Sequence, residues 1–587
     1  MTTIVRATGH GGQTRGLTSG AMPGMGARGQ SGGGAMPGAG VGRFGRMFPD
    51  ATDRPFHDDA LLLGLAHLMT GIGDGDPANP DIDDGKPIRP DPTASPPTEA
   101  DDPGDDNPTI PAGYTYFGQF VDHDITFDPT PLHGKDVDPE AMDDYRTPAL
   151  DLDSVYGTGP DNQPYLYSTG ADGFPRLRVG DDISGGIANP GSAIVSRHDH
   201  FRLPADNGLR MAVLGDKRND ENKLVAQVHG IFIALHNRLI GDTATLLRMG
   251  PFDTSDGEAR FRMTVKAVRW HYQWVVLFDY CRDRICESGM VDEVLNRGGV
   301  PRLSQYFRAT PDFAYMPIEF AVAAFRLGHS MVRPTYALNE KIGCEEPFKA
   351  KRIPIFRIGA NAGEALNGFG QPIPQEWGID WSFFLDGLPK PAADPGLAPL
   401  AIPQPSYRID ATIVDPLAAL PEFGGSQPDA NLAYRNLLRG RKVGLPSGEA
   451  VAQQLGIVPM GFDDLWWAGS IRDHAKVDED RKDLADRCSK FATDNRAALE
   501  GQTPLWYYIL REAELFGATR VANDPFGGQH LGPVGSRIVA ETFIGLLWTD
   551  PASFLHDDGF RPFLGLDGPL AKGGRYGLAD LVRYALG

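Results

Sequence analysis

Residues 116–128 read Tyr-Phe-Gly-Gln-Phe-Val-Asp-His-Asp-Ile-Thr-Phe-Asp, with polar side chains set between aromatic ones. Gln119 and His123 are four residues apart, so on a helix they project from one face. Asp122 and Asp124 flank the histidine and point about 100° away from it on either side, so they face different surroundings. A surface helix has no obvious need for this pattern. The segment is therefore predicted to be a helix that carries a functional site.

The composition excludes several classes of protein. Among the 587 residues, 41% are hydrophobic, which suits a globular core, and the 72 Gly and 49 Pro predict long loops between helices. The formal net charge of −21 disfavours nucleic acid or an anionic membrane as partner, because phosphate binding needs a basic face. A run of roughly 18 apolar residues is absent, so no membrane span is expected. The N-terminus lacks an apolar signal region, which makes a soluble cytoplasmic protein the default and leaves non-classical export open.

Composition also suggests the domain organisation. Residues 1–42 are rich in Gly, Ala, Met and Ser and are predicted to form a flexible arm. Residues 43–587 are predicted to be one large domain, interrupted by an acidic, Pro-rich excursion at 73–107. The four cysteines form no Cys-X-X-Cys motif, which disfavours both a disulfide framework and c-type haem attachment. Cys281 and Cys286 could pair, but buried free thiols are favoured.

Helical periodicity dominates the rest of the chain. Helices are predicted for residues 60–69, 222–240, 261–280, 316–331, 504–515 and 536–548. His229 and His236 are seven residues apart on one of them, which is poor spacing for a shared metal, so both are expected to pack or to hydrogen-bond. Strand-like alternation is scarce. The predicted fold class is mainly α, with long Gly- and Pro-rich loops and little strand.

Three further segments carry polar residues that a core does not need. Residues 147–157 hold Thr147, Asp151 and Asp153 in a short loop, which is either an Asx-rich turn or a site for a hard, oxygen-seeking cation. Arg218 begins a helix beside a carboxylate and is by itself explained as a surface capping pair. His329 follows a glycine in a helical run, and a lone helical histidine is usually structural.

Together these motifs resemble those of the peroxidase-cyclooxygenase superfamily. The motifs that occur in its order and spacing are Gly118–Asp124, Thr147–Gly157, Arg218–Glu221, Phe325–His329 and Arg435–Arg441. The chain looks like a bacterial member of the animal-type haem peroxidases over roughly residues 43–570. Five motifs in order make chance a poor explanation.

The resemblance implies a role in binding haem b or reacting at it for eight residues. On the distal side of the haem, His123 would be the acid–base, Gln119 its hydrogen-bonding neighbour and Arg218 the distal arginine. On the proximal side, His329 would be the iron ligand and Asn436 the partner of the other ring nitrogen of His329. Arg326 would meet a haem propionate, and Asp122 and Glu221 would be the carboxylates ester-linked to haem methyls. It also implies a calcium site. The expected ligands are Asp124, Thr147, Ala149 by its carbonyl, Asp151 and Asp153.

The implied activity is reduction of hydrogen peroxide through the intermediate compound I, with phenols, bromide, iodide or thiocyanate as reductants and oxidative stress response as context. Two departures from the family disfavour strong chloride oxidation. Lys442 and Val443 stand where Asp-His is common, and Asn222 stands where myeloperoxidase has the methionine of its sulfonium link.

Two alternatives remain open. A fatty-acid dioxygenase of the same superfamily is disfavoured, because Arg326 occupies the position of its radical-relay tyrosine. A calcium-stabilised binding module with a vestigial haem site is disfavoured, because every distal and proximal residue is present. Oligomeric state does not follow from the sequence.

Overall fold

The computed structural model describes most of the chain. The described residues are 42–51, 54–70, 106–128, 143–185, 194–204, 209–309, 314–343, 352–389, 403–423, 428–466, 488–517, 520–521, 524, 527–566 and 574–587. The predicted N-terminal arm and the predicted acidic excursion lie almost entirely outside them.

The described chain is one large, mainly helical domain, as predicted. Its α-helices are α1 (Asp59–Thr70), α2 (Gly113–Ile125), α3 (Asp153–Tyr156), α4 (Lys223–Leu239), α5 (Thr243–Leu246), α6 (Gly257–Trp274), α7 (Met290–Leu295), α8 (Tyr306–Ala309), α9 (Ile318–Ala321), α10 (Leu432–Lys442), α11 (Gly448–Gln454), α12 (Phe462–Trp466), α15 (Arg496–Leu499), α16 (Leu505–Phe516), α17 (Pro533–Thr549) and α19 (Leu578–Leu586). Among the described residues, none of the helices combines the length and the hydropathy that crossing a bilayer requires.

Strands are short and form small sheets. They are β1 (Gly42–Gly45), β2 (Asp106–Pro111), β3 (Asp143–Asp144), β4 (Tyr167–Thr169), β5 (Pro175–Leu177), β6 (Val179–Asp182), β7 (His198–His200), β8 (Arg202–Pro204), β9 (Arg210–Ala212), β10 (Met316–Pro317), β11 (Thr335–Tyr336), β12 (Ile353–Pro354) and β13 (Pro405–Tyr407). In the one three-stranded sheet, β1 lies parallel to β10 and antiparallel to β3. The others are two-stranded antiparallel pairs.

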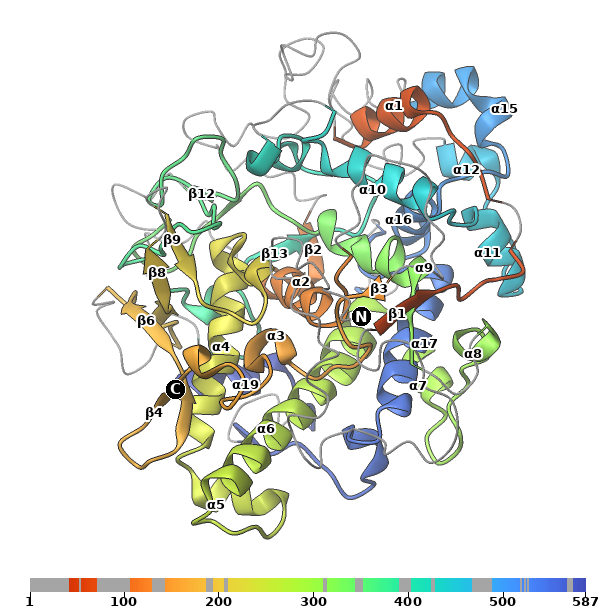
Figure 1. Ribbon diagram of the computed structural model, residues 1–587. Helices are drawn as coiled ribbons and strands as arrows, with labels where there is room; N and C mark the ends of the chain where they lie inside the picture. Colours follow the sequence, from red (N-terminus) through yellow and green to blue (C-terminus); the bar gives the residue numbers. More distant parts are fainter. Residues whose placement is uncertain are drawn as a thin grey trace, which may run out of the picture.

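The helix that opened the sequence argument, α2, lies in the middle of the molecule (Figure 1). It packs against α4, and α4 packs against α6. In another part of the molecule, α10 packs against both α1 and α16. Close approach is possible at Gly118, where a Cβ would lie 2.1 Å from the hydroxyl of Tyr280. Phe120 stacks on Phe232 of α4 at 4.7 Å between ring centroids. The aromatic residues of α2 therefore form its core face.

Two long predicted helices differ in form. The helix predicted at 261–280 begins at Gly257 and changes after Trp274 into a π-helix, η6 (Val275–Ile285). The one predicted at 316–331 is broken into β10, α9 and the 3₁₀-helix η7 (Ala324–His329). Side chains satisfy the backbone carbonyls near this break, because Arg326 Nε donates to Ala321 O (3.1 Å) and the Trp506 indole donates to Arg326 O (3.3 Å).

Candidate functional site

One face of α2 carries the polar residues that the sequence singled out. Gln119 and Asp122 are half-buried, whereas His123 and Asp124 are 5% and 0% exposed. Asp122 Oδ1 accepts a hydrogen bond from Thr126 Oγ1 (3.0 Å), and Asp124 turns instead to the loop before α3, where Leu152 N donates to it (3.1 Å). The two carboxylates beside His123 thus face different surroundings.

His123 is oriented from the protein side. Its Nδ1 lies 2.8 Å from Oδ1 of Asn219, and its Nε2 lies 3.8 Å from Oε1 of Glu221. Burial, reinforced by the Arg218 guanidinium, holds the pKa of His123 well below its usual value, so the ring is neutral at pH 7. An imidazole that donates through Nδ1 keeps a lone pair on Nε2 and can accept a proton there.

Glu221 and Asp122 are carboxyl groups with displaced pKa values. Gln119 Nε2 donates to Glu221 Oε1, and Gln119 Oε1 accepts from Asn222 Nδ2 (3.2 Å). Burial, with Glu422 nearby, raises the pKa of Glu221 to about 8. Burial also raises the pKa of Asp122, against the opposing effect of nearby arginines. Both side chains are half-buried.

Arg218 is anchored at the C-terminal end of α2. Its Nη2 donates to the carbonyls of His123 (3.0 Å) and Thr126 (2.7 Å) and to Oδ2 of Asp216 (2.8 Å), and the guanidinium lies over the ring of Phe127. Its Nη1 makes no hydrogen bond within the described part of the chain. The predicted distal arginine is therefore beside His123, with one end of its guanidinium available.

The predicted proximal residues also lie together. His329, at the end of η7, has its Nδ1 2.6 Å from Nδ2 of Asn436 on α10, and Oδ1 of Asn436 accepts from Arg326 Nη1 (3.0 Å). Burial lowers the pKa of His329 to about 3, so the ring is neutral. A Cβ on the neighbouring Gly328 would meet no atom within 4 Å. A neutral imidazole with open space beside it suits an iron ligand.

Coordination by His329 needs one local adjustment. Ligation through Nε2 requires the ring proton on Nδ1, so Asn436 has to present its amide oxygen to the ring rather than its nitrogen. The amide oxygen and nitrogen occupy nearly the same volume, so a half-turn of the amide suffices. Arg326 Nη1 then loses Asn436 as its acceptor and is available to an anionic group, while Nε keeps its bond to the Ala321 carbonyl. With that half-turn, the residues present fit haem.

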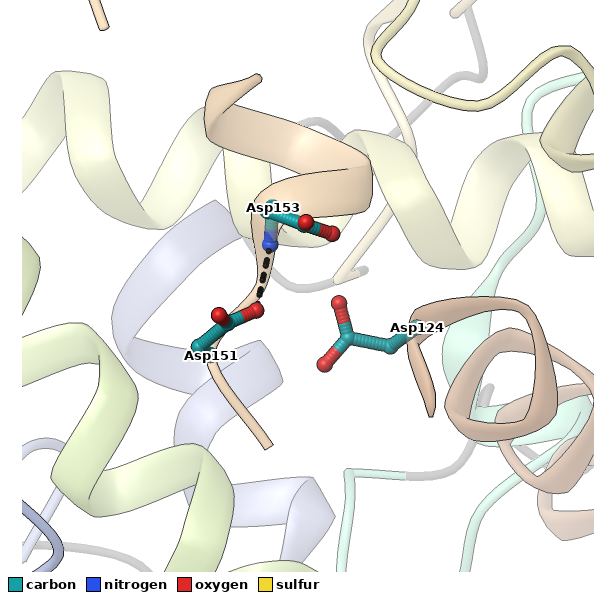
Figure 2. A group of neighbouring side chains, drawn as sticks. All are labelled: Asp124, Asp151 and Asp153. Atoms are coloured by element: carbon teal, nitrogen blue, oxygen red, sulfur yellow. Dashed lines mark hydrogen bonds between the residues drawn. The ribbon is translucent and has the colours of Figure 1, made fainter. Parts of the chain in front are cut away.

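Figure 2 shows Asp124, from α2, facing Asp151 in the loop before α3 and Asp153 at the first position of α3. One carboxylate oxygen of each lies within 4.8 Å of the others. Thr147 Oγ1 donates to Asp151 Oδ2 (2.8 Å), and the Ala149 N–H donates to the carbonyl of Thr147 (2.8 Å). Three carboxylates and a hydroxyl form the all-oxygen set that calcium prefers, so these residues fit that ion.

Two residues connect this carboxylate cluster to Arg218. Arg146 Nη1 lies 3.3 Å from Oδ1 of Asp153, and its Nη2 pairs with Asp216, the carboxylate that also holds Arg218. Sequence reasoning singled out neither Arg146, Asp216 nor Asn219. Asp216 and Asn219 stand within two residues of Arg218, but their partners on α2 and near α3 are visible only in the folded chain.

Part of this sequence is shared with known proteins. The family model described as animal haem peroxidase matches residues 135–469, which include Arg218, His329 and Asn436 and begin after α2. A peroxidasin homolog of Caenorhabditis briggsae is 24% identical over 278 residues, covering 46% of this chain and 18% of that protein. Thyroid peroxidase of Canis lupus familiaris is 25% identical over 316 residues, covering 53% and 30%. The chain spans less than a third of the length of these curated relatives.

The solved structures that this chain matches are more distant in sequence. Peroxidase A from Dictyostelium discoideum has a TM-score of 0.49 and 14% identity, covering 91% of this chain and 89% of that one. Fatty acid alpha-dioxygenase of Arabidopsis thaliana has a TM-score of 0.46 and 12% identity, covering 85% and 71%.

Proposed function

We propose, from the fact that this chain belongs to the animal haem peroxidase family, that it is a haem-dependent peroxidase which reduces hydrogen peroxide with small reductants. Phenols, bromide, iodide and thiocyanate are the reductants proposed. The observation that carries the proposal is a pair of neutral imidazoles, His123 on α2 and His329 on η7, on elements that pack against each other. Each histidine has its Nδ1 against an asparagine amide. The contact with the Asn219 oxygen leaves Nε2 of His123 unprotonated, and Nε2 of His329 becomes so once the Asn436 amide has made its half-turn.

His329 Nε2 would hold haem through its iron, and Nη1 of Arg326 would hold it through a propionate. Haem, when bound, supplies the iron that binds peroxide and exchanges electrons with it. Nε2 of His123 takes a proton from one peroxide oxygen and returns it to the other as the oxygen–oxygen bond breaks. The free end of the Arg218 guanidinium stabilises the negative charge that builds on the leaving oxygen. Gln119 keeps Glu221 in place beside this reaction.

Calcium and covalent haem links complete the proposal. Asp124, Asp151 and Asp153, with Thr147 and the carbonyl of Ala149, bind calcium and fix the end of α2 that carries His123; the oxygen-only donor set supports this. Asp122 and Glu221 would form ester bonds to haem methyls; each ester would replace a carboxyl O–H and a methyl C–H, while one hydrogen peroxide is reduced to two waters. The raised pKa values of both carboxyl groups support their being neutral acids in this site.

An absorption spectrum before and after peroxide tests the function. Haem-loaded protein is expected to show a Soret band that changes on adding hydrogen peroxide, and His123→Ala should slow that change by about 10²- to 10⁴-fold. Acid–acetone extraction then tests the esters: haem should remain with the protein, and Asp122→Asn with Glu221→Gln should release it. Absence of a Soret band after haem supplementation, or oxygenation of linoleate without added peroxide, would contradict the proposal.

A further inference from the structure

Asn219 joins two buried histidines from different elements. It lies in the 3₁₀-helix η4 (Lys217–Asp220), one residue after Arg218, and is 0% exposed. Its Oδ1 lies 2.8 Å from Nδ1 of His123, and its Nδ2 lies 2.9 Å from Nδ1 of His229 on α4. These two histidines are 5% and 1% exposed, so water does not compete for the three side chains.

The Asn219 amide requires Nδ1 to be protonated in one histidine ring and unprotonated in the other. An amide oxygen only accepts and an amide nitrogen only donates, so His123 carries its proton on Nδ1 while His229 has a lone pair there. His229 is fit to accept, because burial, with His200 beside it, holds its pKa well below the usual value and keeps the ring neutral. The ring of His200 packs edge-on against it at 5.1 Å between centroids.

A turned amide reverses the arrangement. If Nδ2 faced His123, Nδ1 of that ring would be the acceptor and its proton would move to Nε2, the nitrogen that lies 3.8 Å from Glu221 Oε1. His123 would then present an N–H where a base is needed. In the turned arrangement His229 would have to donate from Nδ1 to the amide oxygen, so the tautomer of His229 and the orientation of the Asn219 amide are linked.

We infer that Asn219 is a positioning residue that holds His123 in the tautomer with Nε2 unprotonated, and that His229 sets the orientation of the Asn219 amide. This inference rests on the proposed function for its catalytic consequence. The hydrogen-bonding relation itself belongs to the protein chain alone. Asn219 and His229 touch neither peroxide nor haem and act through His123.

The first test reads the tautomer directly. Histidine ring ¹⁵N signals are recorded by nuclear magnetic resonance on the full-length chain before haem is added, with His123 assigned by its loss in His123→Gln. In the wild type, His123 should be protonated at Nδ1 and not at Nε2. His229→Leu should shift the ring towards the other tautomer, and His229→Gln, whose amide oxygen can accept from Asn219, should restore it. Protonation of His123 at Nε2 in the wild type overturns the inference, as does an unchanged tautomer in His229→Leu.

The second test measures the second-order rate of the peroxide-induced Soret change in haem-loaded protein. His229→Leu and Asn219→Leu should slow it at least about tenfold, since a positioned base contributes about 10²- to 10⁴-fold. His229→Gln should remain within about threefold of the wild type, which a purely structural role of the histidine does not predict. His236→Leu is the matched control, because His236 is also buried on α4 but bonds the Pro175 carbonyl instead (3.2 Å).

The outcomes separate the inference from the proposed function. A wild type that does not react with peroxide contradicts the peroxidase, and the ring spectrum still decides the role of Asn219. A reactive wild type whose rate is unchanged in His229→Leu contradicts the inference alone, as does His236→Leu slowing the reaction as much as His229→Leu. If the leucine variants fail to fold, the wild-type tautomer and His229→Gln decide the matter.

Discussion

Replacing Arg202 with Met should destabilise the protein far more than any surface ion pair can. Arg202, in β8, has a side chain that is 1% exposed and lies between Asp199 and Asp220, whose side chains are 3% and 6% exposed. Its guanidinium makes four hydrogen bonds of 2.6–3.0 Å to the two carboxylates. Burial alone would lower its pKa, but the bonds to the two aspartates raise it. Asp220 stands between Asn219 and Glu221, so this clamp fixes the segment that reaches the site.

The size of the stability loss in Arg202→Met follows from leaving the two buried aspartates without their partner. Removing one member of a buried ion pair costs roughly 3–5 kcal/mol, and here one arginine serves two carboxylates, so the upper part of that range is expected. Burial raises the pKa of Asp220 and Arg202 opposes this, so without Arg202 the Asp220 carboxyl protonates more readily than in the wild type. Because the folded variant binds this proton more tightly than the unfolded chain, its stability falls as pH rises, and the deficit should be larger at pH 8 than at pH 5.

Urea denaturation followed by tryptophan fluorescence and far-ultraviolet circular dichroism measures the effect. The control is Arg210→Met on the paired strand β9, because Arg210 and its partner Asp181 are 47% and 75% exposed, and its loss should cost less than about 1 kcal/mol. Adding Asp199→Asn and Asp220→Asn to Arg202→Met should recover most of the loss. Equal deficits for Arg202→Met and Arg210→Met, or no recovery, would refute the reasoning.

Two further predictions concern pH and calcium. Burial raises the pKa of Glu512 to about 8, so folding binds a proton there and the free energy of unfolding falls as pH rises from about 4.5 to 8. Glu512→Gln should therefore flatten the pH dependence of the unfolding free energy by about 4 kcal/mol. An unchanged pH profile in Glu512→Gln contradicts this. Calcium at 100 times its dissociation constant should stabilise the wild type by about 2.7 kcal/mol in thermal unfolding, and a chelator should reverse this stabilisation. An equal response to calcium in Asp151→Asn would exclude the carboxylate cluster as the calcium site.

The local sequence predicted those parts of the fold that depend on neighbours along the chain. Apolar spacing predicted α4 nearly to its ends, since each helical hydrogen bond joins residues four apart. It failed at residues 316–331, where the chain breaks into β10, α9 and η7. Arg326 and Trp506 supply the hydrogen bonds near that break. A partner from a distant segment carries no signal in local periodicity.

For the candidate site, the sequence by itself determined which residue types are present and, through the family resemblance, which roles to expect of them. Helical spacing on residues 116–128 already separated Asp122 from Asp124. Only the tertiary structure decided the partners: Asn219 meets His123 from 96 residues away, and Asn436 meets His329 from 107. A hydrogen bond between such residues depends on the path of the whole chain between them, because orientation and distance are set by the packing of several helices. The spacing of residues along the sequence does not contain that path.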